Sequence, residues 1–242
     1  MSRIAIIGYG KMGKEIEKAL LSRNQEIVAR IDNAQDWETQ WQAFLSSDVA
    51  IEFSQPDVAI ANFFRCFDHG IPLVSGTTGW YDRFDEVMEH CRKSSNAFIY
   101  GTNFSIGVNL FFKIAETMAQ LLGNESAYQP GIEEIHHIHK KDAPSGTAIT
   151  LAETVLPLLP EKSGWTLNQQ ENAEKLNITA QRIGEVQGVH ALKFASIADE
   201  IELKHTAKSR AGFAEGAVRA ALWLLKHPNI YNFKDIFDKV NG

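Results

Sequence analysis

Apolar and polar positions follow two different rhythms along this chain, and the change falls near residue 105. Before it, short apolar runs rich in β-branched residues alternate with segments of helical period. The runs are residues 4–7, 26–31, 49–53, 71–74 and 97–100, and the helical segments are residues 14–22, 58–69 and 84–93. Strands that alternate with helices favour a parallel sheet covered on both faces, so the pattern predicts a doubly wound, Rossmann-like α/β domain.

After residue 105, strands become the dominant pattern. A long amphipathic helix is expected at residues 108–122, a strand at 132–138, a helix at 147–156 and a weakly periodic polar stretch at 161–175. Three strand-like runs follow at residues 177–186, 189–197 and 200–206, and the chain closes with helical segments at 215–226 and 233–240. This order predicts a second, α+β domain built on an antiparallel sheet with one solvated face.

Composition narrows the classes of partner. The 242 residues are 44% hydrophobic and 22% charged, which suits one large core or two small ones. The formal net charge of −6 argues against nucleic acid. Cys66 and Cys91 lack the spacing of a disulfide framework, and no apolar run approaches the roughly 20 residues of a membrane span. We therefore expect a cytoplasmic protein that binds small molecules and does not bind membranes.

A glycine-rich turn stands between the first expected strand and the first expected helix. It reads Gly8, Tyr9, Gly10, Lys11, Met12, Gly13, the G-x-G-x-x-G pattern. Its glycines permit a tight turn, the approach of a pyrophosphate and close packing of the helix. Asp32 follows at the end of the second strand, where a carboxylate accepts hydrogen bonds from ribose hydroxyls. Together these features predict a dinucleotide site; a plain glycine turn is the alternative.

The residue after Asp32 bears on the choice between NADH and NADPH. Asn33 is neutral, so no arginine stands where a 2′-phosphate is commonly held. Lys11 and Arg30 are nearby cations that could partly replace it. The sequence predicts that NADH is at least as acceptable as NADPH.

Two further polar loops follow expected strands, at the sheet edge where open α/β folds bind ligands. The first contains Gly76, Thr77 and Thr78, and the second contains Gly101, Thr102, Asn103 and Phe104. Both are candidate walls of a nicotinamide site. Ordinary strand-to-helix turns are the alternative interpretation.

A histidine- and lysine-rich segment is the most unusual part of the chain. It contains His136, His137, His139, Lys140 and Lys141. A zinc site is disfavoured because, on a strand, successive histidines would point to opposite faces and the lysines would repel a cation. We therefore expect no metal. A solvated basic strand end is a second interpretation.

Acid–base chemistry on a dicarboxylate explains this segment better. Histidine supplies protons near neutral pH, and lysine supplies a point charge for a carboxylate. Ser145, Gly146 and Thr147 then open a helix with hydroxyls and free N–H groups that can hold a second carboxylate. Such a dianion beside a nicotinamide would be reduced by hydride transfer.

These motifs resemble the dihydrodipicolinate reductase family, the 4-hydroxy-tetrahydrodipicolinate reductases of bacterial lysine and diaminopimelate biosynthesis. The resemblance covers nearly the whole chain and rests on residues 8–13, 76–79, 103–109, 136–148, 182–190 and 209–217. It implies that His136 is the proton donor and Lys140 the catalytic lysine. It also implies that His137, Lys140, Gly146 and Thr147 bind the substrate carboxylates.

The same resemblance implies a cofactor site and an assembly. The cofactor contacts are residues 8–13, Asp32, residues 76–78 and 101–104, and the pair Arg210 and Phe213. Residues 1–106 and 208–242 would form a dinucleotide-binding domain. Residues 107–207 would form a substrate-binding and tetramerisation domain built on a mixed sheet, so a homotetramer is expected. Family members commonly have a basic residue after the ribose-binding acid, and Asn33 departs from that pattern.

The expected reaction is the NADH- or NADPH-dependent reduction of the cyclic, hydroxylated dipicolinate precursor to tetrahydrodipicolinate, with loss of water. A non-enzymatic dinucleotide sensor and another two-domain oxidoreductase, acting on an amino acid or semialdehyde, are the alternatives. His136 and Lys140 disfavour the sensor, because it needs no proton donor beside a dianion pocket.

Overall fold

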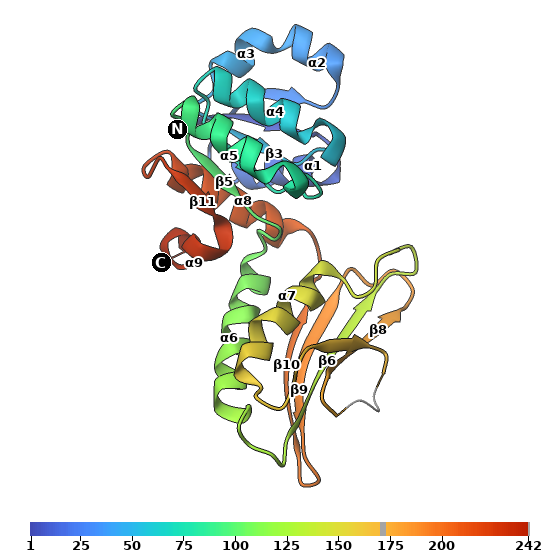
Figure 1. The fold of residues 1–242 in the computed structure, drawn as a ribbon. Helices are drawn as coiled ribbons and strands as arrows, with labels where there is room; N and C mark the ends of the chain where they lie inside the picture. The colour runs from blue at the N-terminus through green and yellow to red at the C-terminus, as the bar shows by residue number, and fades with distance from the viewer. Residues whose placement is uncertain (170–172, 242) are drawn as a thin grey trace. The chain divides into compact units, whose positions relative to one another are not determined.

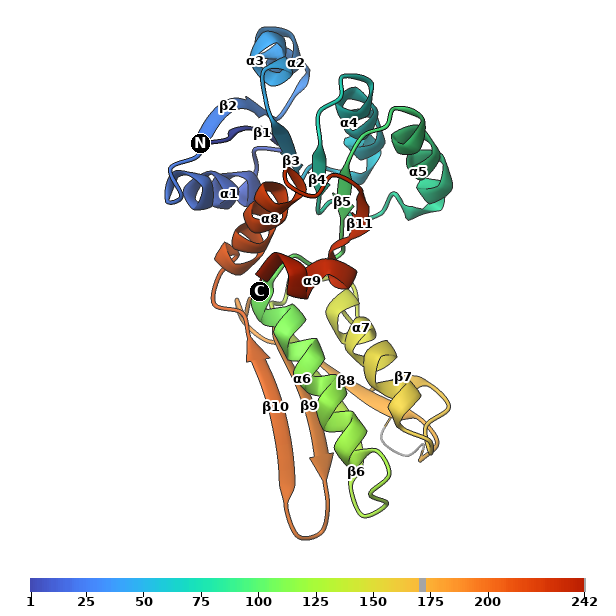
Figure 2. The same cartoon turned by 90° about the vertical axis from the view of Figure 1, so that its left-hand side faces the viewer.

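The computed structural model describes residues 1–169 and 173–241 and divides the chain into two units (Figures 1 and 2). The first unit contains Met1–Ile106 and Arg210–Gly242, and the second contains Gly107–Ser209. Both ends of the chain therefore belong to the first unit, and the second unit is an insertion between them. Each unit has its own sheet and its own apolar core.

A six-stranded parallel sheet forms the centre of the first unit. Its order is β11-β5-β4-β3-β1-β2. The strands are β1 (Arg3–Ile7), β2 (Glu26–Ile31), β3 (Val49–Glu52), β4 (Leu73–Ser75), β5 (Phe98–Tyr100) and β11 (Ile230–Asn232). The chain turns from β1 to β2 on one side and to β3 on the other, so a topological switch point lies at the carboxyl end of β1.

Alternating side chains of β1 divide the core of this unit into two layers. Ile4 and Ile6 pack on the side of α1 (Lys11–Leu21), α8 (Ala211–Leu224) and α9 (Phe233–Asn241). Ala5 and Ile7 pack on the side of α3 (Trp41–Leu45), α4 (Pro56–Asp68) and α5 (Phe84–Lys93). Helices thus cover both faces of the sheet, which Figure 2 shows for α1, α8, α4 and α5, and the predicted doubly wound fold is confirmed.

Four short elements of this unit escape the sequence pattern. They are α2 (Ala34–Thr39), α3, the 3₁₀ turn η1 (Tyr81–Arg83) and the edge strand β11. Each element is too short for a helical or strand period to be recognised, because a period becomes visible only when apolar positions recur several times.

A five-stranded mixed sheet forms the second unit, with the order β10-β9-β6-β8-β7. The strands are β6 (Gln129–His136), β7 (Trp165–Leu167), β8 (Leu176–Arg182), β9 (Val189–Ala195) and β10 (Glu200–Thr206), and the helices are α6 (Ile106–Leu122), α7 (Gly146–Val155) and the 3₁₀ turn η2 (Leu156–Leu158). Strand β6 lies between β8 and β9, parallel to the first and antiparallel to the second. The mixed sheet that the family resemblance implies is confirmed. The purely antiparallel order expected from the residue pattern is wrong at β8, because β8 pairs in parallel with β6 and not with β9.

The two faces of this second sheet differ in polarity. Ile132, Ile178, Leu192 and Phe194 share a core cluster with residues of α6 and α7. On the opposite face, Lys193 forms an ion pair with Glu133 at 3.0 Å. The predicted polar stretch at 161–175 contains β7, and its residues 170–172 lie outside the described residues. Within residues 1–169 and 173–241, no helix has both the length and the apolar character that a membrane span requires.

Candidate functional site

The glycine turn after β1 has the tight geometry that its sequence predicts. Gly8 has a φ of 87°, and a Cβ atom there would lie 2.1 Å from the carbonyl oxygen of Phe53. A Cβ at Gly13 would lie 2.3 Å from the carbonyl oxygen of Gly8, whereas a Cβ at Gly10 would meet nothing within 4 Å. Close packing therefore requires Gly8 and Gly13, while Gly10 leaves open backbone at the start of α1 where a pyrophosphate fits.

The other residues of the turn serve different purposes. Lys11 is exposed, and Met12 packs against the core beneath α1. Tyr9 donates its hydroxyl to Glu17 and its backbone N–H to Oδ1 of Asp32, which lies 2.7 Å away. The second bond fixes the carboxylate of Asp32 beside the glycines.

A pocket of about 460 Å³ opens at this edge of the sheet. Gly8, Asp32 and Asn33 all line it, so the structure brings the predicted glycine turn and ribose-binding acid to one concave surface. Two more carboxylates, Glu38 and Asp57, also line this pocket. With Asp32 these make three carboxylates against one cation, Arg65, and the net negative charge of this lining disfavours an additional phosphate group.

Asn33 has a structural task at this pocket. Its side chain accepts a hydrogen bond from the backbone N–H of Asp36 at 3.1 Å, and the Asp36 carboxylate accepts the backbone N–H of Asn33 in return. This reciprocal pair is a capping box at the start of α2. Arg65 also lines this pocket, and its guanidinium carbon lies 4.8 Å from the centre of the Trp37 ring, which lines the pocket as well.

The loop after β4 turns one of its predicted cofactor residues inward. Thr77 is buried, its hydroxyl donates to Oε1 of Glu52 at 3.0 Å, and its backbone N–H donates to Oγ of Ser75 at 3.2 Å. Glu52 is fully buried, and burial raises the pKa of its carboxyl group although these hydroxyls oppose the effect. Thr77 therefore anchors the loop, while Gly76 is half-buried and Thr78 exposed.

The loop after β5 mixes core and surface positions. The ring of Phe104 is buried and stacks on Phe233, with 4.5 Å between the ring centres. A Cβ at Gly101 would lie 3.0 Å from Cβ of Phe233. Thr102 is exposed and Asn103 half-buried. A cofactor contact from the Phe104 ring is therefore not supported, because that ring completes the core.

The last two predicted cofactor residues stand together at the start of α8. Arg210 is exposed at the N-cap position, and the backbone N–H of Phe213 donates to its carbonyl oxygen at 3.1 Å. Phe213 is half-buried. Both belong to the first unit, as do the glycine turn and Asp32.

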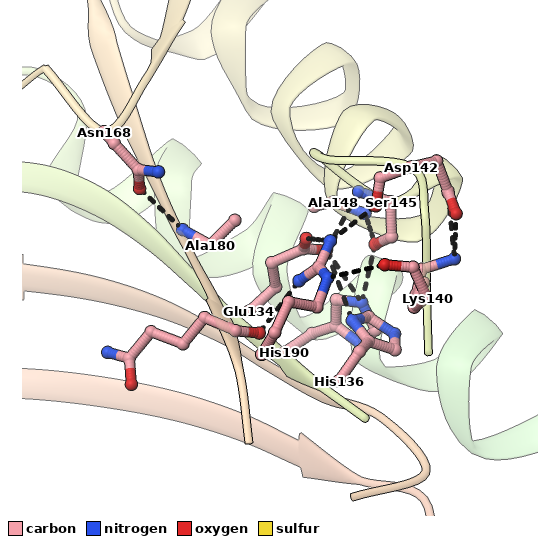
Figure 3. Close-up of polar contacts among 11 residues, drawn as sticks. Glu134, His136, Lys140, Asp142, Ser145, Ala148, Asn168, Ala180 and His190 are labelled. Atoms are coloured by element: carbon pink, nitrogen blue, oxygen red, sulfur yellow. Dashed lines mark hydrogen bonds and ion pairs between the residues drawn. The ribbon is translucent and has the colours of Figure 1, made fainter. Parts of the chain in front are cut away.

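In the second unit, strand register gathers polar side chains on the helix-covered face. Glu134 and His136 are buried on β6, two residues apart, so they share one face. Glu134 stands opposite His190 of β9, and His136 stands opposite Arg182 of β8. Four polar residues from three strands therefore meet, and Figure 3 shows Glu134, His136 and His190 together beside Ser145 at the start of α7.

Glu134 is the centre of this group. Its Oε1 accepts a hydrogen bond from Nη2 of Arg182, and its Oε2 accepts the backbone N–H of Ser145, each at 3.0 Å. Nδ1 of His136 and Nε2 of His190 lie 3.6 and 3.8 Å from the same Oε2. Burial opposes the ionised form, but the bonds from Ser145 and Arg182 together with His136 hold the pKa of Glu134 below its usual value.

Burial has the opposite consequence for the two histidines. It lowers the pKa of His136, and Lys140 and Arg182 lower it further, whereas Glu134 opposes them. It lowers the pKa of His190 to about 4, so this ring is neutral near pH 7. The rings of His136 and His190 lie edge to face, with 5.0 Å between their centres.

The rest of the histidine segment lies in a turn. Strand β6 ends at His136, earlier than predicted, so His137 and His139 lie beyond the strand. His137 is half-buried, and His139 is exposed and lies 3.3 Å from a carboxylate oxygen of Glu185. Nζ of Lys140 lies 2.8 Å from both carboxylate oxygens of Asp142.

Ser145 does not present its polar groups outward. It is buried, its N–H donates to Glu134, and its Oγ accepts the N–H of Ala148 at 3.2 Å and lies 3.1 Å from Nε2 of His190. Its hydroxyl therefore caps α7, and the sequence-based expectation that it binds a carboxylate directly is not supported. Gly146 is exposed and Thr147 is half-buried, so the first turn of α7 itself remains accessible.

Glu134, His136 and His190 also meet one geometric requirement of a metal site, because each offers a ligand atom within 4.8 Å of the others. The Arg182 guanidinium, bonded to the same carboxylate, places a positive charge beside any such cation. The backbone N–H of Ser145 already donates a hydrogen bond to Oε2 of Glu134. The charges around the cluster therefore disfavour a metal ion.

Comparison with known proteins identifies the family. The model of the dihydrodipicolinate reductase N-terminus matches residues 2–104, and the model of the C-terminus matches residues 107–237. The chain belongs to the dihydrodipicolinate reductase family. It is an oxidoreductase with the activity that this family is named for, and lysine biosynthesis follows from that activity.

Two curated relatives extend over nearly the whole chain. A 4-hydroxy-tetrahydrodipicolinate reductase of Christiangramia forsetii is 45% identical and covers 96% of both chains. One of Lawsonia intracellularis is 34% identical, over 98% of this chain and 99% of its own. A dipicolinate-bound dihydrodipicolinate reductase from Paenisporosarcina sp. TG-14 has the same fold, with a TM-score of 0.76, 23% identity and coverage of 98% and 99%. Reductases of this family use a nicotinamide dinucleotide.

The residues that surround His136 were not predicted as functional residues from the sequence. Glu134, Arg182 and His190 come from three strands and are up to 56 positions apart, so only strand pairing brings them close. One local signal does exist. Glu134 stands at an inward position of β6, two residues before His136, where an unpaired carboxylate would be unfavourable.

Proposed function

We propose that the first unit binds the nicotinamide dinucleotide and that the second unit binds the cyclic dicarboxylate and supplies the proton. The glycine turn and Asp32 fit the cofactor because Gly10 leaves open backbone and Asp32 is held beside it. The bound cofactor supplies a hydride to the ring of the substrate. The polar cluster of the second unit supports the other role.

His136 is the proposed proton donor for this reduction. It is 7% exposed, and its imidazole lies among charged groups that set its protonation state. The hydroxyl group of the precursor leaves as water together with a proton from the neighbouring ring carbon, which creates a double bond in the ring. One hydride and one proton from His136 then reduce the ring to tetrahydrodipicolinate. His136 then regains its proton from solvent.

Two positively polarised features suit the two substrate carboxylates. Lys140 offers a charged ammonium group, at present paired with Asp142, and His137 lies in the same turn. The accessible N-terminal turn of α7, with Gly146 and Thr147, offers backbone N–H groups and the positive end of the helix dipole. We propose that one carboxylate replaces Asp142 at Lys140 and that the other binds at this helix end.

For the cofactor, we propose that NADH is used at least as well as NADPH. The carboxylates of Asp32, Glu38 and Asp57 line the pocket beside the glycine turn, and Asn33 caps α2. Neither feature favours the 2′-phosphate that distinguishes NADPH.

We also propose that the protein assembles as a homotetramer through its second unit, as the family resemblance implies. Strand β10 is an edge strand, and Ile201 on it is 41% exposed. Ile197, in the turn that leads to β10, is fully exposed. Exposed edge strands and apolar residues are commonly covered in assemblies. Light scattering would give about 108 kDa, four times 27.0 kDa.

The single observation that supports the proposed mechanism best is His136 beside Glu134 and Lys140, next to an open helix start. The test is a steady-state assay with the product of dihydrodipicolinate synthase as substrate. The oxidation of NADH, and in a separate assay of NADPH, is monitored by absorbance. Turnover is expected with NADH. Cofactor binding without turnover would support the sensor, and turnover only with an amino acid or semialdehyde would support the other oxidoreductase.

A further inference from the structure

Glu134 is a buried carboxylate that two other elements hold in one position. Arg182 of β8 binds its Oε1, and the backbone of Ser145, at the N-cap of α7, binds its Oε2. Both contacts come from groups that are themselves positioned by regular structure. The carboxylate is therefore fixed in orientation and ionised, because a buried charge persists only with such partners.

The two ring nitrogens of His136 have different surroundings. Nδ1 is buried, has no hydrogen-bond partner among the described residues and lies 3.6 Å from Oε2 of Glu134. Nε2 is next to Gly188, where a Cβ atom would lie 3.2 Å away. Because Gly188 has no side chain, the space beside Nε2 is left open. Nδ1 thus faces the carboxylate, and Nε2 faces the position that a side chain at residue 188 would otherwise occupy.

Charges of both signs face His136 from several elements. Lys140 and Arg182 oppose its protonation, while Glu134 and Asp142 favour it. His190, whose cross-strand neighbour is His205, approaches from β9 and is neutral near pH 7. Asp142 is bonded to Lys140 and largely exposed, so Glu134 is the buried negative charge that opposes the two cations.

We propose that Glu134 is a positioning residue for His136: its carboxylate keeps Nδ1 protonated and directed inward, so that Nε2 carries the proton delivered to the substrate. The inference rests on the proposed role of His136 as proton donor. A carboxylate that orients a catalytic imidazole through its far nitrogen is a general device of acid–base sites. No step transfers a proton to Glu134 itself.

The test is the pH profile of kcat/KM in Glu134→Gln. Gln keeps the shape of Glu but removes the negative charge, so the pKa of His136 is expected to fall. Activity that requires protonated His136 then declines at a lower pH, with about a tenfold loss near pH 8 for each pKa unit, and this loss shrinks as the pH is lowered. Glu134→Asp, which keeps the charge, should restore part of the wild-type profile.

Glu133→Gln is the matched control, because Glu133 directly precedes Glu134 in β6, faces the other side of the sheet and pairs with Lys193. Its pH profile should equal that of the wild type. Imidazole NMR of His136 gives the same pKa without turnover, so it serves even where Glu134→Gln is poorly active. An unchanged His136 pKa, or an equal loss of activity at every pH, would overturn the positioning role.

The result is separable from the proposed function. Wild-type protein that does not reduce the substrate contradicts the function, whatever the His136 pKa. A wild type that turns over, with an unshifted profile in Glu134→Gln, contradicts only the role of Glu134.

Discussion

Arg30 and Glu17 form an ion pair in which Nε and Nη2 of Arg30 lie 2.7 and 2.6 Å from Oε1 of Glu17. The hydroxyl of Tyr9 donates to the other carboxylate oxygen. The guanidinium of Arg30, one of the cations that the sequence offered for a 2′-phosphate, is therefore engaged by α1.

This pair predicts the cofactor preference. The kcat/KM for NADH is expected to equal or exceed that for NADPH, because the pocket beside Asp32 is lined by carboxylates. Glu17→Gln weakens the hold on Arg30 and should raise the relative use of NADPH. Glu15→Gln, on the same helix and paired with Lys18, is the control. A strong NADPH preference of the wild type would contradict the prediction.

Replacement of His136 by Asn should remove the proton donor while preserving the cofactor site. A general acid contributes about 10²- to 10⁴-fold, so kcat should fall by at least about 10²-fold. The dissociation constant for NADH, measured by fluorescence titration, should stay within about twofold, because the glycine turn and Asp32 belong to the first unit. Wild-type turnover in His136→Asn would exclude this residue as the acid.

Lys140→Ala should raise KM for the dicarboxylate and lower kcat, because a charged partner of one carboxylate is lost. A hydrogen bond to a charged group contributes about 1.5–3 kcal/mol, so kcat/KM should drop by about tenfold or more. The neighbouring Lys141 is exposed, and Lys141→Ala should behave like the wild type in steady-state kinetics. Equal effects of the two substitutions would point to general electrostatics instead of a specific contact.

Removal of metal ions should leave turnover unchanged. Glu134, His136 and His190 are close enough for a metal ion, but Arg182 and Ser145 already occupy the Glu134 carboxylate. Enzyme dialysed against a chelator is expected to retain its kcat. Loss of activity that added Zn²⁺ restores would show that the cluster binds a functional metal.

His190 predicts a pH dependence of stability. Burial lowers its pKa to about 4, below the ordinary value of 6.5, so between these values the unfolded chain binds a proton that the folded chain excludes. The free energy of unfolding should therefore fall as pH drops from about 6.5 to about 4, by up to roughly 3 kcal/mol.

Urea unfolding followed by circular dichroism at several pH values measures this loss. His190→Gln should flatten the dependence, because an amide does not titrate. His139→Gln, which changes an exposed histidine of the same unit, should leave it as in the wild type. The same slope in all three proteins would refute the assignment to His190.

Local patterns determined much of the first unit. The apolar runs around Ile4 and Ile51 are fully buried strands, and the glycine turn with Asp32 follows from spacing alone. The helix predicted at residues 84–93 has the same limits in the structure. These features could be predicted because they depend on residues that are close together in the sequence.

The burial of individual side chains within a loop could not be predicted from the sequence. Thr77 and Phe104 belong to polar loops by sequence, yet the first binds buried Glu52 and the second completes an aromatic core. The sequence identified both loops but not which of their side chains point inward, because that depends on the elements packed beneath them.

By itself the sequence determined the family, the dinucleotide turn and the histidine segment with its adjoining helix start. Only the tertiary structure decided that β6 lies between β8 and β9, and that Glu134, Arg182 and His190 therefore surround His136. It also turned Ser145 from an expected ligand into a helix cap bonded to Glu134. The reason is physical: strand order and register are set by burying whole faces against other elements, and no local stretch of residues encodes that choice.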